Sequence, residues 1–182
     1  LTLFGENRVQ EAKAKISDCP GHLRWHFIGN LQTNKCRDAV ALFDFLHAVD
    51  SLHLAAELNK RCEQAAKVMP VLLEVNVSGE ASKHGFTPEA AVAAMDAFSD
   101  FPQLELHGLM TMAPFSRHPE SARPYFQKLR ELKNACEDQL GAPLPELSMG
   151  MSGDYEIAIE EGATLIRLGT TLFGPRAAAN KD

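Results

Sequence analysis

The sequence predicts an α/β fold, a parallel (β/α)8 TIM barrel that lacks its first βα unit. Seven short apolar segments alternate strictly with amphipathic segments of helical spacing, which is typical of right-handed βαβ crossovers and a parallel sheet. A complete barrel has eight units and about 250 residues, whereas this chain has seven units in 182 residues. Because Leu1 already lies within an apolar segment, we expect the absent unit to be the first.

An open doubly wound sheet is the alternative to a barrel. A dinucleotide-binding sheet of that kind carries G-x-G-x-x-G after a strand, and no predicted strand here is followed by that pattern. No segment resembles an interdomain linker either. We therefore predict a single barrel domain over residues 1–182, incomplete at its N-terminus.

Apolar runs and helical spacing alternate through the first half of the chain. Val9, Ala12 and Ile16 share one face of the first predicted helix. Asp50 and Ser51 both offer an N-cap to a longer helix. The elements predicted in this half are strand 1–4, helix 8–16, strand 25–28, helix 33–42, strand 45–49, helix 51–66 and strand 71–77.

The same alternation continues through the second half. Thr87 followed by Pro88 is typical of an N-cap with proline at the first helical position. Pro124 is expected to mark the true start of a long helix, or a bend in it. The elements predicted here are helix 87–98, strand 104–110, helix 119–140, strand 147–149, helix 154–161, strand 165–168 and a short turn around 172–173.

The composition excludes several classes of protein. The chain has 18 Lys and Arg against 24 Asp and Glu, and its charge of −6 argues against nucleic acid as an obligatory partner. No apolar run approaches the roughly 20 residues that span a bilayer, so we predict no membrane association. The 4 cysteines form no C-x-x-C pair and the 7 histidines no ligand pair, which predicts reduced cytoplasmic thiols and no metal site.

The most specific functional signal follows the last two predicted strands. The loop at 148–154 is rich in Ser and Gly and leads into a helix, and Gly169 and Thr170 follow the final strand. Free backbone amides and hydroxyls of this kind suit a phosphate, and barrels often bind phosphate with these neighbouring loops. The alternative is that both are ordinary turns whose polar residues cap helices.

Arg167 is the second candidate. It shares one face of its strand with Leu165 and Gly169, so it should point towards the mouth of the barrel. A buried arginine stays protonated and needs a partner. That partner is either a ligand or a carboxylate such as Glu74.

The remaining polar candidates have plainer alternatives. Asn7 either contacts a ligand or caps the helix beside it, and His26 is interpreted as a packing residue rather than a base. Lys35 and Lys83 are interpreted as loop lysines, although Lys83 is close enough to a strand end to meet an anion. The methionines after the fifth and sixth strands are predicted to fill the core or a pocket. Spacing alone therefore predicts a barrel for a phosphate-bearing ligand.

Six motifs at these same loops run through the whole chain in order. They are F-G-E-N-R-V-Q-E (4–11), W-H-F-I-G-N-L-Q-T-N-K (25–35), S-K-H-G-F (82–86), G-L-M-T-M (108–112), L-S-M-G-M-S-G-D (147–154) and I-R-L-G-T-T-L-F-G-P-R (166–176). In these motifs the chain resembles the family of pyridoxal phosphate homeostasis proteins.

The resemblance implies a barrel of the alanine racemase N-terminal type that binds pyridoxal 5′-phosphate (PLP). It further implies a cytoplasmic, non-catalytic carrier, monomeric at full length, that supplies PLP-dependent apo-enzymes. A PLP-dependent racemase or decarboxylase of the same fold is the alternative function, and a phosphosugar-binding barrel without PLP is a third. Carried over to this sequence, the implied PLP-binding residues are Asn7 beside the ring, Arg167 at the pyridine nitrogen, and Ser148, Ser152, Gly169 and Thr170 at the phosphate.

The chain departs from the family at one important position. The family's Schiff-base lysine lies on the first barrel strand, upstream of F-G-E-N, and none of the lysines here stands at that place. We therefore expect no catalytic residue and no covalent capture of PLP by the family's route within residues 1–182.

Overall fold

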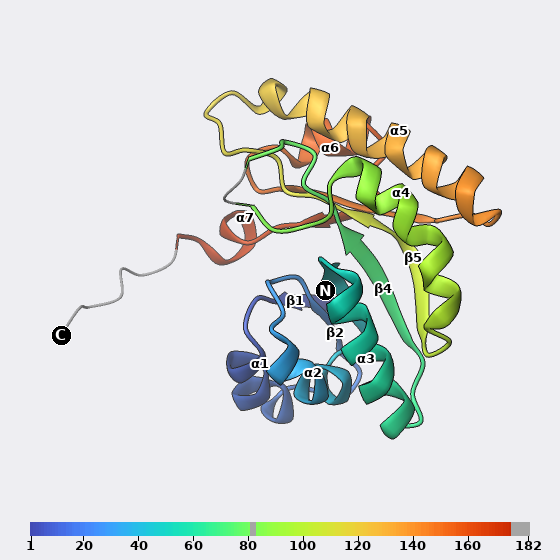
Figure 1. The fold of residues 1–182 in the computed structure, drawn as a ribbon. Coiled ribbons are helices and arrows are strands. Elements are labelled where there is room, and N and C mark those ends of the chain that lie inside the picture. The colour runs from blue at the N-terminus through green and yellow to red at the C-terminus, as the bar shows by residue number, and fades with distance from the viewer. Residues whose placement is uncertain (81–82, 176–182) are drawn as a thin grey trace.

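Seven parallel strands form one curved sheet in the computed structural model of the chain, which describes residues 1–80 and 83–175. Each strand pairs with the next along the chain, in the order β1-β2-β3-β4-β5-β6-β7. The sheet bends into a nearly closed barrel with β1 and β7 at its two edges (Figure 1). The strands are β1 (Leu3–Glu6), β2 (Arg24–Phe27), β3 (Phe45–Val49), β4 (Met69–Glu74), β5 (Leu104–Met110), β6 (Glu146–Met151) and β7 (Leu165–Arg167).

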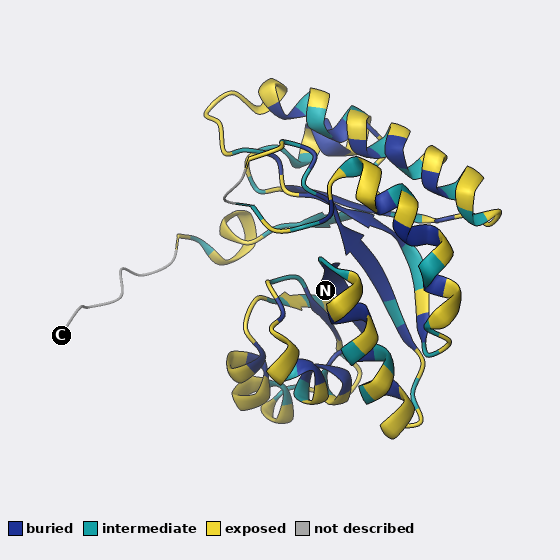
Figure 2. Cartoon of the chain, in the orientation of Figure 1, coloured by how far each residue is buried: buried dark blue, intermediate teal, exposed yellow. Residues whose placement is uncertain are grey.

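Helices cover the outer face of the sheet (Figure 1). Their apolar sides pack against the strands and their polar sides face outwards, as the dark and light sides of α3, α4 and α5 show in Figure 2. The helices are α1 (Val9–Lys15), α2 (Cys36–Leu42), α3 (Leu52–Gln64), α4 (Pro88–Ala97), α5 (Arg123–Leu140), α6 (Tyr155–Glu160) and α7 (Thr170–Phe173). Short 3-10 turns adjoin them at Ile16–Asp18, Thr33–Lys35, Phe98–Asp100 and Pro119–Ala122.

Two predicted helix caps are confirmed. The Ser51 hydroxyl accepts a hydrogen bond from the Leu54 amide at 3.3 Å, so Ser51 rather than Asp50 caps α3. The Thr87 hydroxyl accepts from the Ala90 amide at 3.2 Å, and a proline stands in the first turn of α4. Each such cap satisfies an amide that would otherwise lack a partner at the start of the helix.

The seven predicted strands are all present, but several boundaries differ. The fourth strand was predicted to reach Val77 and ends at Glu74, after which Val75 makes only an isolated bridge to Phe86. The long helix begins at Arg123 rather than Pro119, so Pro124 marks its true start. The predicted turn after β7 is instead the short helix α7. Boundaries shift in this way because they depend on neighbouring strands and loops as well as on local periodicity.

The main apolar core lies between the sheet and the helices. The rings of Phe27 and Phe43 are buried there with 5.1 Å between their centroids. Of the methionines predicted to fill the core, Met149 belongs to it and is fully buried, whereas Met112 and Met151 are exposed. A second, smaller cluster consists of Phe45, Ala48, Leu72 and Met110, with Leu165 packed against it.

Candidate functional site

The loop after β6 meets the start of α7 through one hydroxyl. The Ser152 Oγ accepts hydrogen bonds from the Gly169 amide at 3.2 Å and the Thr171 amide at 3.3 Å. Asp154 supports the loop, since its Oδ1 accepts from the Met151 amide at 2.6 Å. Because α7 begins at Thr170, its first amides have no carbonyl partner within the helix. We call the group of Ser152, Gly169, Thr170 and Thr171 the amide cluster. Its Gly169 and Thr171 amides converge on the Ser152 oxygen, and converging backbone amides of this kind can stabilise an anion.

Arg167 ends β7 directly before this cluster. Its Nη1 donates to the Ser148 Oγ at 2.6 Å and its Nη2 donates to the Thr111 carbonyl oxygen at 2.9 Å. Protein surrounds the guanidinium, although part of its surface remains reachable from solvent. Burial lowers the pKa of Arg167 to about 10, which still leaves it protonated at neutral pH.

The predicted carboxylate partner of Arg167 is not in contact with it. Among residues 1–80 and 83–175, neither Glu74 nor any other carboxylate lies within ion-pair distance of the guanidinium. Glu74 is itself buried, and this burial, followed by the nearby charge of Asp50, raises the pKa of its carboxyl. The positive charge of Arg167 is therefore held by a hydroxyl and a carbonyl, without a countercharge in contact.

Ser148 lies in the surroundings of Arg167. It is completely buried, and besides accepting from Arg167 its Oγ lies 2.9 Å from the His47 Nδ1. The hydroxyls of Ser148 and Ser152 therefore contact different groups. The assignment of Ser148 to a phosphate stays a prediction, whereas its contact with Arg167 is part of the structure.

Two histidines extend this network into the barrel. The His47 Nε2 lies 2.9 Å from the His26 Nδ1, and both rings pack edge-on against Phe45 at 4.9 Å between centroids. Burial lowers the pKa of His26 to about 4 and that of His47 to about 2. His26 was interpreted as a packing residue and is buried and hydrogen-bonded. His47 was missed, although a second histidine in the next predicted strand was a signal that could have found it.

Asn7 lies at the other edge of the sheet. It is exposed at the end of β1, where it lines a cavity of about 280 Å³ together with Lys35 and residues of the loop after β2. A side chain at Gly29 would press on the Asn7 backbone, since its Cβ would lie 2.8 Å from the Asn7 carbonyl carbon. Within the described residues, no hydrogen bond joins Asn7 to Arg167 or to the amide cluster.

Lys83 connects two loops. Its Nζ donates to the Met112 carbonyl oxygen at 3.2 Å and lies 3.4 Å from Glu80. The lysine thus ties the loop after β4 to the loop after β5. Two residues of the quoted motifs, Ser82 and Arg176, lie outside the described residues.

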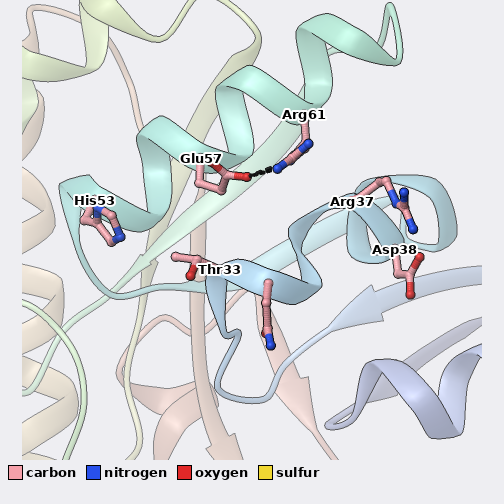
Figure 3. Close-up of a pocket in the computed structure, with 7 residues that line it drawn as sticks. Thr33, Arg37, Asp38, His53, Glu57 and Arg61 are labelled. Atoms are coloured by element: carbon pink, nitrogen blue, oxygen red, sulfur yellow. Dashed lines mark hydrogen bonds and ion pairs between the residues drawn. The ribbon is translucent and has the colours of Figure 1, made fainter.

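A larger cavity of about 410 Å³ lies between helices α2 and α3, outside the sheet (Figure 3). Its charged groups are largely paired with one another or with neighbours. Arg61 contacts Glu57 at 2.6 Å, and Asp38 contacts Lys13 at 3.3 Å. Its lining residues are Thr33, Asn34, Arg37, Asp38, His53, Glu57 and Arg61. This cavity contains none of the predicted site residues.

Neither a membrane-spanning helix nor a cluster of metal-ligating side chains occurs in the part of the chain that the structure describes. No helix there is long and apolar enough to cross a membrane. No three His, Cys, Asp or Glu side chains there come together in a way that could hold a metal ion.

The chain matches known proteins along nearly its whole length. The family model described as the alanine racemase N-terminal domain matches residues 2–177. The pyridoxal phosphate homeostasis protein of Aquifex aeolicus (strain VF5) is 46% identical over 177 residues, which cover 97% of this chain and 78% of that protein. The protein of the same name from Mus musculus is 38% identical over 192 aligned positions, covering 98% and 70%.

Solved structures agree with these sequence matches. PipY of Synechococcus elongatus PCC7942, solved without PLP, superposes with a TM-score of 0.89 at 39% identity, covering 94% of this chain and 81% of that one. The same protein with PLP bound gives a TM-score of 0.85. An alanine racemase of Clostridium difficile 630 gives 0.76 at 16% identity, covering 98% and 46%, which is a likeness of fold alone. The predicted barrel of the alanine racemase N-terminal type is thereby confirmed.

Proposed function

Because the chain belongs to the family of pyridoxal phosphate homeostasis proteins, we propose that it binds PLP and buffers the supply of this cofactor. The observation that carries the proposal is Arg167, a half-buried cation beside the amide cluster without a carboxylate partner in the described chain. The amide cluster, as the anion-binding group, and Arg167, as the cationic donor, therefore lie together at the ends of the paired strands β6 and β7.

The donors of this site fit the two polar ends of PLP. The Ser152 hydroxyl and the amides of Gly169 and Thr170 are the predicted phosphate donors, and the amides of Gly169 and Thr171 already converge on the Ser152 oxygen. In the structure the Ser152 oxygen accepts hydrogen bonds from two amides of the amide cluster. A phosphate oxygen would accept from these amides alongside Ser152 or in its place. We propose that Ser148 holds the Arg167 guanidinium in position, in addition to its predicted role at the phosphate.

Arg167 determines which form of the pyridine nitrogen is favoured. A guanidinium only donates hydrogen bonds, so it pairs with an unprotonated nitrogen, whereas a carboxylate would stabilise the protonated form. When bound, PLP supplies an aldehyde that reacts with amines and a pyridine ring that withdraws electrons, more weakly when its nitrogen is unprotonated. Arg167 therefore favours holding the cofactor over stabilising a full carbanion.

A guanidinium donor at the pyridine nitrogen supports the function of a carrier rather than that of an enzyme. The relatives are named as homeostasis proteins, and the racemases share only the fold at low identity. We propose that the chain is one PLP-binding barrel domain, that its full-length form is a cytoplasmic monomer, and that PLP-dependent apo-enzymes receive its cofactor. Turnover of alanine between its enantiomers at about 1 s⁻¹ or faster, the ordinary range of enzymes, would favour the racemase alternative instead.

The experiment that tests the site is a titration of the chain with PLP, followed by tryptophan fluorescence and ligand absorbance. The variant with both Arg167→Ala and Ser152→Ala should bind at least about 100-fold more weakly, because it loses a charged donor and the centre of the amide cluster. Arg37→Ala removes an exposed arginine from α2 and is the matched control. Equal affinity in the double variant and the control would contradict the assignment. Inorganic phosphate should compete with PLP in the unaltered chain, and a phosphosugar that binds more tightly than PLP would favour the third alternative.

Asn7 provides a separate prediction. Gly29→Ala should displace the Asn7 backbone, because the new methyl group would overlap its carbonyl. β1 is an edge strand and can yield, so we expect a loss of about 1–2 kcal/mol in the free energy of unfolding, with PLP affinity reduced several-fold. Gly5→Ala, in β1 itself, is the control, since the three atoms nearest to its Cβ all belong to the flexible Ile28 side chain. If Gly29→Ala binds PLP as the control does, Asn7 does not contact the ring.

A further inference from the structure

One unbroken chain of hydrogen bonds crosses the interior of the barrel. It runs from the Arg167 Nη1 to the Ser148 Oγ at 2.6 Å, from there to the His47 Nδ1 at 2.9 Å, and from the His47 Nε2 to the His26 Nδ1 at 2.9 Å. Its members come from β7, β6, β3 and β2, so it joins the two halves of the sheet. We call these four residues the relay.

The chemistry of Arg167 gives the relay a direction. A guanidinium has donors and no acceptor, so the Ser148 oxygen must accept from it. The Ser148 hydroxyl then has one proton left to donate. Ser148 is completely buried, and its other partner within the described residues is the His47 Nδ1. If that nitrogen carried a proton, the Ser148 proton would be buried without an acceptor, which costs free energy.

The same reasoning sets the donor and acceptor nitrogens of the two histidine rings. His47 accepts at Nδ1, so its proton is on Nε2, from which it donates to the Nδ1 of His26. His26 accordingly carries its own proton on Nε2. Across the described residues no fully buried side-chain nitrogen or oxygen lacks a hydrogen-bond partner, which agrees with a relay whose inner members are all satisfied.

We propose that His47 and His26 are positioning residues for Arg167, which they hold through Ser148. By accepting the Ser148 proton, His47 keeps a lone pair of that hydroxyl turned towards the guanidinium. His26 in turn holds His47 in the required tautomer. The proposal rests on the proposed function, in which Arg167 presents a donor to the pyridine nitrogen of PLP.

The environment of the two rings supports the neutral form that the relay needs. A doubly protonated ring would have no acceptor for Ser148. Burial keeps both rings uncharged, and the charge of Arg24 adds to this effect at His26. At His47 the charge that a protonated His26 would carry and the charge of Arg167 act in the same direction. Asp44 and Glu146 are the carboxylates that act on His26 in the opposite sense, more weakly than burial.

The first test needs no PLP. Long-range ¹H–¹⁵N correlation spectra of the chain at neutral pH should show that Nδ1 is unprotonated and Nε2 protonated in both His26 and His47. In Ser148→Ala the preference of His47 should weaken, and the Arg167 guanidinium resonances should show faster rotation and exchange. A proton on the His47 Nδ1 in the unaltered chain would overturn the proposal.

The second test uses PLP titration to compare two substitutions of His47. His47→Asn keeps an acceptor near the Nδ1 position and His47→Leu does not. We expect His47→Leu to weaken PLP binding about tenfold and His47→Asn to restore most of that loss. A purely structural role would make the smaller Asn at least as harmful as Leu, and that result would overturn the proposal. His53→Leu, on the exposed side of α3, is the control.

The two tests separate failure of the relay from failure of the proposed function. If the unaltered chain does not bind PLP, the proposed function fails while the tautomers of the unliganded chain still test the relay. If PLP binds but the tautomers are reversed, the relay fails alone.

Discussion

Lowering the pH from 6.5 to 4.5 is expected to reduce the free energy of unfolding by about 3–5 kcal/mol, mainly through two buried histidines. Burial lowers the pKa of His26 from 6.5 to about 4 and that of His47 to about 2. In this window the unfolded chain takes up a proton on each ring and the folded chain does not. The stabilisation is therefore complete above pH 6.5 and is lost as the pH falls towards the folded pKa values.

Urea unfolding at a series of pH values measures this loss, and Trp25, the single tryptophan, reports it from a buried position. His26→Phe should reduce the slope of the free energy against pH, whereas His53→Gln on the surface of α3 should leave it unchanged. Glu74 acts in the opposite sense, because burial raises the pKa of its carboxyl and the folded chain holds that proton more tightly. A free energy that stays level from pH 6.5 to 4.5 would show that the rings are charged or accessible.

Replacing Gly108 by alanine should destabilise the chain by at least about 3 kcal/mol. Gly108 lies in β5, paired with Leu72 of β4 on one side and Glu146 of β6 on the other. Its Cβ would overlap the Glu146 carbonyl oxygen and lie 2.7 Å from the carbonyl carbon. Because backbone lies on both sides of Gly108, β5 cannot move aside to make room for the methyl group. The hydrogen-bonded ladder between β5 and β6 must therefore open.

The matched control for this substitution is Gly21→Ala, because a Cβ at Gly21 would meet nothing within 4 Å. Urea unfolding at pH 7.5, followed through Trp25, should separate the two variants clearly. Gly21→Ala should stay within about 0.5 kcal/mol of the unaltered chain. A Gly108→Ala chain with the same unfolding midpoint would mean that β5 and β6 are not packed as closely as the structure shows.

Much of the fold could be predicted because its signals are local. Apolar runs of strand length and helical spacing identified all seven strands, and cap residues identified the starts of α3 and α4. The errors lie where distant residues decide. β4 ends at Glu74 although Val75 and Val77 are apolar, because the backbone there pairs with Phe86: the Phe86 amide donates to the Glu74 carbonyl and the Asn76 amide donates to the Phe86 carbonyl.

The candidate site was predicted less evenly. The loop motifs indicated Ser152, Gly169 and Arg167, and the structure brings these residues to the ends of adjacent strands. The partners of Arg167 could not be predicted, because they come from residues 56 and 19 positions away along the chain. Glu74 was a reasonable candidate by charge, yet a hydroxyl and a carbonyl occupy that place.

The sequence by itself determined the order of the seven strands and their helices and the polar loops at the strand ends. Periodicity and turn chemistry are properties of neighbouring residues, so they can be read without a structure. Only the tertiary structure decided that Ser148, His47 and His26 stand behind Arg167 in one directed relay. Curvature of the sheet brings four different strands to a common interior, and no pattern along the chain records which side chains meet there.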